Sequence, residues 1–260
     1  MSIKDGAFIN IIESIKNMME NSPKAEFIEN DEYFLFCVGE NTTEGHANGI
    51  FCFDDQNAEK IFKEAEDYFK NKGFSYTFWI RDKKNEKIEK ILLDKGYEPN
   101  REPGLPVMAI DRKLNIPNLD SDYKLVQVKT IQEIRDFITV VRNCFSLEEN
   151  TAQAMFNSSD VLDGKVNKGY LVYYKNRPVS AVQTYKAGGV AGIYWVATEE
   201  DMRGRGLGKF ITSIGTNEAL DLGVDTVVLQ ASRLGEPVYE KLGYKLIEYY
   251  RTYKIKIDEE

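Results

Sequence analysis

The sequence of 260 residues has little of several residue types that would point to particular classes of protein. Its three cysteines, Cys37, Cys52 and Cys144, form no CxxC pair, so we expect reduced core thiols, no disulfide framework and no metal site. The single histidine, His46, lies in a polar loop, and we expect it at the surface. No run is long and apolar enough to span a bilayer, and residues 1–21 lack the apolar run of a signal peptide. We therefore expect a cytoplasmic protein without a membrane partner.

The sequence also has fewer basic than acidic residues. Lys and Arg total 34 against 42 for Asp and Glu, and the formal charge of −8 disfavours nucleic acid as a partner. What is present is a composition of 42% hydrophobic and 29% charged residues, which supports a packed, soluble core. A chain of this length can hold one large domain or two domains of about 100 to 150 residues.

A polar segment with a proline, residues 115–122, separates two stretches of stronger pattern, and we place a domain boundary there. The prediction is an N-terminal half, residues 1–116, and a C-terminal half, residues 117–260. In the C-terminal half, apolar spacing predicts alternating helices and strands, including an antiparallel meander of three strands. The predicted strands are 123–128, 169–174, 178–185, 190–197, 226–230 and 245–256, and the predicted helices are 131–145, 152–156, 206–222 and 237–242.

The N-terminal half repeats part of this order in a weaker form. A predicted helix at 58–72, a strand at 75–80 and a helix at 85–94 are followed by the segment LLDKGY, which aligns with YEKLGY at 239–244. Where the C-terminal half has RGRGLGK, the N-terminal half has DDQNAEK, which contains no glycine. The pattern indicates a tandem arrangement whose first copy has lost the glycine-rich loop.

The glycine-rich segment follows a predicted strand and opens a predicted helix. Gly204, Gly206 and Gly208 permit positive φ and close backbone approach, so that successive N–H groups can point into one concavity that binds an anion. The positive end of the following helix favours the same ligand, and a pyrophosphate is its natural occupant. Three cations concentrate positive charge here: Arg203, Arg205 and Lys209.

Spacing separates three nucleotide-binding loops that could have this composition. The Rossmann pattern GxGxxG does not fit because these glycines alternate, and the P-loop does not fit because Phe210, not Ser or Thr, follows Lys209. Arg203, Gly206 and Gly208 match the pyrophosphate loop of the GNAT acetyltransferases, which has Gln or Arg, two residues, Gly, one residue, then Gly or Ala. From about residue 123 to 257 the sequence resembles this family.

The resemblance implies an α/β (α+β) fold of two GNAT-like modules, each a mixed, mostly antiparallel sheet flanked by helices, the first of them degenerate. It also implies acetyl-CoA as co-substrate, with the N–H near Val196 facing the thioester carbonyl. Tyr239 stands where the family places a general acid, and a phenol of pKa about 10 can protonate a departing thiolate of pKa about 8.5. The implied cofactor-binding residues are Val196, Ala197, Thr198, Arg203, Gly204, Arg205, Gly206, Leu207, Gly208, Lys209, Ala231 and Ser232.

The general base stays open, because many members of the family carry a carboxylate on the central strand and residues 192–196, GIYWV, contain none. A residue elsewhere, a water relayed through Glu199 or another carboxylate, or no protein group at all could serve. We expect an N-acetyltransferase that moves an acetyl group to the primary amine of a small molecule or peptide by direct attack. The alternative is an inactive acyl-CoA sensor or structural module. The N-terminal half could shape the acceptor pocket or form a homodimer contact.

Overall fold

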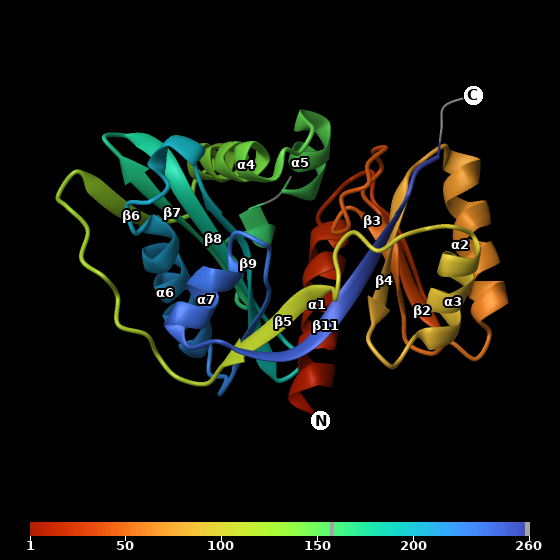
Figure 1. Cartoon of the computed structure of the whole chain (residues 1–260). Coiled ribbons are helices and arrows are strands. Elements are labelled where there is room, and N and C mark those ends of the chain that lie inside the picture. Colours follow the sequence, from red (N-terminus) through yellow and green to blue (C-terminus); the bar gives the residue numbers. More distant parts are fainter. Residues whose placement is uncertain (157–158, 258–260) are drawn as a thin grey trace.

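The computed structural model describes residues 1–156 and 159–257, which form helices on both faces of a sheet (Figure 1). The helices are α1 (Ile3–Glu20), α2 (Ala58–Lys72), α3 (Glu86–Asp94), α4 (Ile131–Phe145), α5 (Glu149–Met155), η1 (Ser159–Val161), η2 (Glu200–Met202), α6 (Leu207–Leu220) and α7 (Glu236–Leu242). The strands are β1 (Glu26–Glu29), β2 (Tyr33–Cys37), β3 (Asn48–Cys52), β4 (Tyr76–Arg81), β5 (Leu105–Ile110), β6 (Tyr123–Gln127), β7 (Asn167–Tyr174), β8 (Arg177–Ala187), β9 (Val190–Thr198), β10 (Val227–Gln230) and β11 (Lys245–Ile255).

Within the described residues the strands form one sheet of eleven, in the order β1-β2-β3-β4-β11-β5-β10-β9-β8-β7-β6. Neighbouring strands run antiparallel except for the pairs β3–β4 and β9–β10, which run parallel. The expected mixed α/β class with a mostly antiparallel sheet flanked by helices is confirmed.

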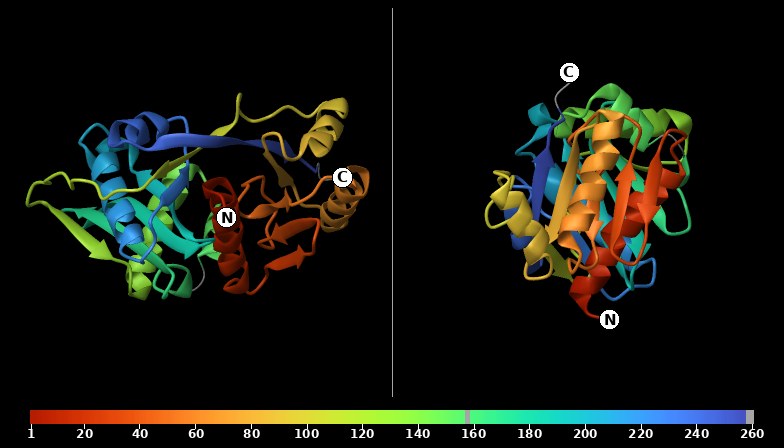
Figure 2. Two further views of the ribbon diagram at one scale, coloured as in Figure 1. Left: turned by 90° about the horizontal axis from the view of Figure 1, so that it is seen from below. Right: turned by 90° about the vertical axis from the view of Figure 1, so that its right-hand side faces the viewer.

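The two halves of the chain exchange strands at the middle of this sheet. β5 lies between β10 and β11, where Met108 pairs with both Leu229 and Leu246. β11 then continues onto β4, with Tyr253 opposite Phe78. Figure 2 shows β11 extending from the α7 side across into the strands of the N-terminal half. Strands from before residue 116 pair with strands from after residue 117. The domain boundary at this position therefore stays a prediction.

Three groups of buried side chains fill the space between the helices and the sheet. The largest lies under α1, α4 and α5 and includes Phe137, Phe156 and Trp195. A second, under α6 and α7, covers the opposite face of β8 to β10, and a third lies between α2, α3 and the strands β2 to β4. Both faces of the central strands are therefore covered, and β4 is buried along its whole length and β9 along most of it.

Helix α1 joins the N-terminal half to the sheet of the C-terminal half. Its Asn10 is fully buried, and the Nδ2 group donates to the carbonyls of Tyr185 and Ala187, each at 3.1 Å. The Oδ1 atom of the same side chain accepts a hydrogen bond of 2.6 Å from the hydroxyl of Tyr194. A buried amide without hydrogen bonds is costly, so these bonds of Asn10 favour one position of α1 against β8 and β9.

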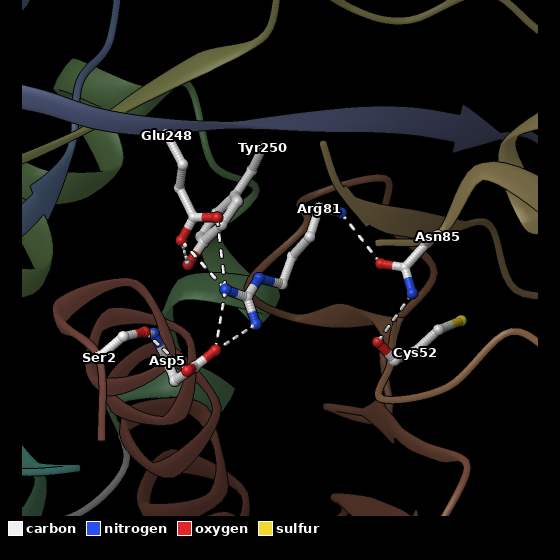
Figure 3. A network of polar contacts seen from close by, with 7 residues as sticks. All are labelled: Ser2, Asp5, Cys52, Arg81, Asn85, Glu248 and Tyr250. Atoms are coloured by element: carbon white, nitrogen blue, oxygen red, sulfur yellow. Dashed lines mark hydrogen bonds and ion pairs between the residues drawn. The ribbon is translucent and has the colours of Figure 1, made fainter. Parts of the chain in front are cut away.

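A second polar network joins α1, β4 and β11 (Figure 3). The guanidinium of Arg81 donates to Asp5 at 3.2 Å and to Glu248 at 3.4 Å, and it lies over the ring of Phe8. Tyr250 donates to the other carboxylate oxygen of Glu248 at 3.3 Å. Burial raises the pKa of Glu248, and the nearby Arg81 only partly offsets this rise.

Local signals account for α4, which has the bounds predicted for it. Thr130 accepts from the N–H of Glu133, and the Glu133 carboxylate accepts from the N–H of Thr130, which together form a capping box. Across the described ranges, 1–156 and 159–257, no helix combines the length and the apolar character needed to cross a membrane.

Candidate functional site

The segment between β9 and α6 presents a row of backbone N–H groups. Gly204 and Gly206 have φ angles of +76° and +82°, a region that side chains with a Cβ rarely adopt. The first turn of α6 has no side-chain cap, and in the part of the chain that the structure describes the N–H groups of residues 204–209 bond to no acceptor. These unpaired donors and the positive end of the α6 dipole form a site for an anion.

Space in front of this loop is open. A Cβ placed on Gly204, Gly206 or Gly208 would have no atom within 4 Å, so packing does not require glycine at these positions, whereas the positive φ of Gly204 and Gly206 favours it. The side chain of Arg203 folds back and donates to the carbonyl of Thr198 at 3.2 Å, which ties the loop to the end of β9.

Strand β9 separates from β10 just before this loop. The two strands pair only through Ala191 and Gly192 of β9, and Leu229 and Gln230 of β10 continue beside β5 alone. On the other edge of β9 the register with β8 shifts next to Trp195, whose φ is +52°. Such a bulge redirects the strand, and the backbone of β9 beyond Gly192 is left without a strand partner on the β10 side.

The loop, the end of β9 and helix α7 together enclose a cavity of about 680 Å³, which we call the main cavity. This volume lies in the range of sites that hold cofactors. The predicted site residues that line it are Val196, Ala197, Thr198, Arg203, Gly204, Gly206, Leu207, Gly208, Lys209, Ser232 and Tyr239.

The other two predicted residues lie elsewhere. Arg205 lines a smaller polar hollow of about 290 Å³ beside Asp120 and Tyr123, away from the main cavity. Ala231 is fully buried, and its backbone is occupied on both sides: its N–H donates to Pro106 and its carbonyl accepts from Arg101. The side chains of these two residues therefore do not line the main cavity, and their role in cofactor binding stays a prediction.

Tyr239 is the acid–base candidate in the main cavity. Its side chain is 6% exposed and packs over Gly235, and its hydroxyl has no hydrogen-bond partner within residues 1–156 and 159–257. Burial raises the pKa of Tyr239, so the phenol stays protonated through the neutral range and can act only as a donor there.

The loop before β5 holds the helix that carries Tyr239. Arg101 of the N-terminal half donates to the carbonyl of Ala231 at 3.2 Å and forms an ion pair with Glu236 in the first turn of α7. The end of β10 and the start of α7 are thereby fixed by a residue more than a hundred positions away in the chain.

Sequence reasoning missed several residues that line the main cavity: Cys144, Phe145, Thr212, Arg233, Leu234, Gly235, Val238 and Lys241. Cys37 and Cys52 are buried as expected, but Cys144 is half-buried and faces the cavity beside Thr198 and Arg203. Burial raises the pKa of its thiol to about 11. The apolar helix before Cys144 suggested packing, and only the tertiary contact between α4 and β9 reveals its position.

Glu199, directly after β9, and Glu248 of β11 both have hydrogen-bond partners. Glu199 accepts from the side chain of Asn143 at 3.0 Å, and Glu248 is bound by Arg81 and Tyr250. Among the described residues there is no group of three His, Cys, Asp or Glu side chains placed to hold a metal ion.

Comparison with protein families matches residues 130–254 to the acetyltransferase (GNAT) domain. Comparison with curated proteins gives no match.

Solved structures resemble the whole chain. A GCN5-related N-acetyltransferase from Kribbella flavida has a TM-score of 0.71 at 15% identity, over 98% of this chain and 96% of that one. Another from Sphaerobacter thermophilus has a TM-score of 0.65 at 16% identity, over 89% and 83%. A tandem GNAT protein from the clavulanic acid biosynthesis pathway has a TM-score of 0.62 at 9% identity, over 94% and 88%. At these identities the likeness concerns the fold alone.

Proposed function

Residues 130–254 form a GNAT acetyltransferase domain, a fold that supports acyl transfer, and from this premise we propose that the protein transfers an acetyl group from acetyl-CoA to a primary amine. The acceptor is a small molecule or a peptide, and the amine attacks directly without an acyl-enzyme. One observation carries the proposal: the main cavity has a row of unpaired N–H donors at one end and the protonated phenol of Tyr239 in its wall.

The glycine-rich loop fits the pyrophosphate of CoA. The N–H groups from Gly204 to Lys209 have no acceptor among the described residues, and the helix dipole of α6 adds to their attraction for an anion. Arg203 and Lys209 line the same cavity and supply positive charge on a chain of charge −8. The unpaired edge of β9 at residues 196–198 offers backbone groups to the pantetheine arm.

Acetyl-CoA supplies an activated thioester when it is bound. The protein then contributes orientation, exclusion of water and protons. Val196 follows the bulge at Trp195 and lines the main cavity, where its N–H would stabilise the developing negative charge of a carbonyl oxygen. Tyr239, kept neutral by burial, donates its proton to the leaving thiolate.

Calorimetry of acetyl-CoA and CoA with the wild type and with Gly206→Glu tests the cofactor site. The new carboxylate fills and charges the open space in front of the loop, so binding should vanish in a variant that stays folded. Gly206→Ala is the matched control, because its Cβ meets no atom and only the backbone strain of about 1–2 kcal/mol remains. Failure of the wild type to bind acetyl-CoA would refute the proposal.

A panel of polyamines, amino sugars, amino acids and lysine peptides then tests transfer. Acetylation of any of these amines supports the enzyme. Tight cofactor binding without turnover on the whole panel would instead favour an acyl-CoA sensor, whose support is the absence of a carboxylate from residues 192–196.

A further inference from the structure

The only histidine of the chain forms a pair with a carboxylate in the turn before β3. Oε1 of Glu44 lies 3.0 Å from Nδ1 of His46 and also accepts from the His46 backbone N–H at 3.3 Å. Burial alone would raise the pKa of Glu44, but the contacts with His46 outweigh it and lower that pKa. Glu44 is therefore an ionised partner that holds the ring in one orientation.

This pairing leaves the other ring nitrogen free to accept a proton. When Nδ1–H donates to a carboxylate, the neutral imidazole carries its lone pair on Nε2. Nε2 has no hydrogen-bond partner anywhere in the two described ranges, and the side chain is 23% exposed, so water or a ligand can reach it. The pair has the form of a general base with its orienting carboxylate.

The His46 ring connects the N-terminal half to the wall of the main cavity. It packs edge-on against Trp79 of β4 and against Trp195 of β9, with centroid distances of 5.3 and 5.1 Å. Trp195 in turn contacts Phe145 at 5.3 Å, and Phe145 lines the main cavity. Trp195 is also the bulged residue directly before Val196. One aromatic side chain thus separates His46 from the segment where the thioester would lie.

Backbone hydrogen bonds and close packing fix the conformation of the turn that carries His46. The carbonyl of Gly45 accepts from Nε1 of Trp79 at 2.8 Å, and a Cβ on Gly45 would approach the same indole to 3.0 Å. The backbone carbonyl of Glu44 accepts from Ala47 at 2.9 Å and from Asn48 at 3.1 Å. These contacts hold the backbone on either side of His46 and so restrict the position of its ring.

We propose that His46, oriented by Glu44, is the proton acceptor for the amine substrate, so that the N-terminal half supplies the base of the reaction. The inference rests on the proposed function. An ammonium group gives one proton to Nε2 through a bridging water, and the neutral nitrogen forms the C–N bond as the C–S bond breaks. The thiolate takes a proton from Tyr239, and the second proton lost by nitrogen restores the phenol. The imidazolium releases its proton to solvent.

The charged groups around His46 fit this role. Glu44 is the ionised group in direct contact, Lys254 of β11 acts on Glu44 from a distance, and the neighbouring faces from β4 and β9 are the indoles of Trp79 and Trp195. Only the neutral imidazole can accept a proton, so we expect the kcat/KM of the wild type to rise with pH.

A magnetic resonance experiment tests the location without any acceptor. Because the chain has one histidine, a protein without a histidine tag gives a single set of imidazole signals that needs no assignment. Saturating acetyl-CoA should shift the Hε1 signal, and Glu44→Gln should shift the same signal in the free protein. Ring signals that do not respond to bound acetyl-CoA would overturn the proposal.

Kinetics test the role. With the amine of the panel that gives the highest turnover, His46→Gln should lower kcat/KM at pH 7 by about 10²- to 10⁴-fold and remove the rise with pH. His46→Phe keeps a ring against both indoles and should be equally impaired, which separates packing from proton transfer. Glu44→Gln should show a smaller loss, and Glu40→Gln, whose carboxylate pairs with Lys24 at the surface, should show none.

The two proposals fail in different ways. If the wild type binds acetyl-CoA and turns over, but His46→Gln keeps its activity within about threefold and the same pH profile, the base assignment is wrong and the enzyme stands. If the wild type acetylates no amine, the transferase itself fails. In that case no proton transfer at His46 exists, and the base assignment fails with it.

Discussion

Replacement of Tyr239 by phenylalanine separates catalysis from stability in this protein. The hydroxyl lines the main cavity and has no hydrogen-bond partner in residues 1–156 and 159–257, so its removal leaves no buried group unsatisfied. The ring keeps its contacts with Gly235 and with Tyr244, whose centroid lies 5.9 Å away. We therefore expect the free energy of unfolding to change by no more than about 0.5 kcal/mol.

The expected loss of rate is much larger. A positioned general acid contributes about 10²- to 10⁴-fold, which corresponds to about 3 to 5 kcal/mol of transition-state stabilisation. Burial raises the pKa of Tyr239, so ionisation of this phenol should not lower the rate anywhere below about pH 10. The variant should bind acetyl-CoA with unchanged affinity, since the phenol donates only to the leaving group.

The measurement is a steady-state assay of the acetylated amine by mass spectrometry, beside calorimetry of acetyl-CoA and urea unfolding of both proteins. Direct detection of the acetylated product avoids thiol-reactive reagents, which would also react with the half-buried Cys144. A Tyr239→Phe variant that keeps kcat within about threefold, with normal binding and stability, would refute the general-acid assignment. A variant that loses about 2 kcal/mol or more of stability would show that the hydroxyl is bonded after all.

Three further predictions test other parts of the structure. Arg81→Met leaves the buried Glu248 without its ion-pair partner and should lower the free energy of unfolding by about 3 to 5 kcal/mol in urea denaturation. Since burial raises the pKa of Glu248, this loss should shrink as pH falls and the carboxyl protonates; an equal loss at pH 5 and pH 8 would contradict the argument. Cys144, with a pKa of about 11, should react with iodoacetamide roughly 10²-fold more slowly than a free thiol, and CoA should protect it further, which peptide mass spectrometry measures. Arg101→Ala frees the start of the helix that carries Tyr239 and should lower kcat about tenfold with little change in the KM for acetyl-CoA, whereas unchanged kcat would exclude a positioning role.

The local structure of the C-terminal half could be predicted because its signals are short-range. The helix at residues 131–145 was delimited by apolar spacing, and the structure has it at the same residues behind the capping box of Thr130. The alternating glycines indicated the loop for the same reason: positive φ at Gly204 and Gly206 is a property of the residues themselves. The resemblance to the GNAT family implied a common site for the loop and Tyr239, and both line the main cavity.

Contacts between distant parts of the chain could not be predicted in this way. The segment LPVMAI of β5 is apolar throughout, and nothing in it specifies that its neighbours are β10 and β11. His46 was expected at the surface because its turn is polar, whereas its ring meets Trp195, nearly 150 residues later. The displacement of Arg205 from the main cavity depends likewise on how the loop turns, which the motif does not encode.

The exchange of strands sets an order of events during synthesis on the ribosome. β4 is complete at residue 81, but its partner β11 begins at residue 245, so one edge of the N-terminal strands stays open while most of the chain is made. Domains generally fold as units from the N-terminus, whereas each half of this chain has strands whose partners lie in the other half. We expect that a nascent chain stalled before β11 exposes the edges of β4 and β5 to chaperones, and that the two halves expressed as separate polypeptides recover the fold only when they are mixed.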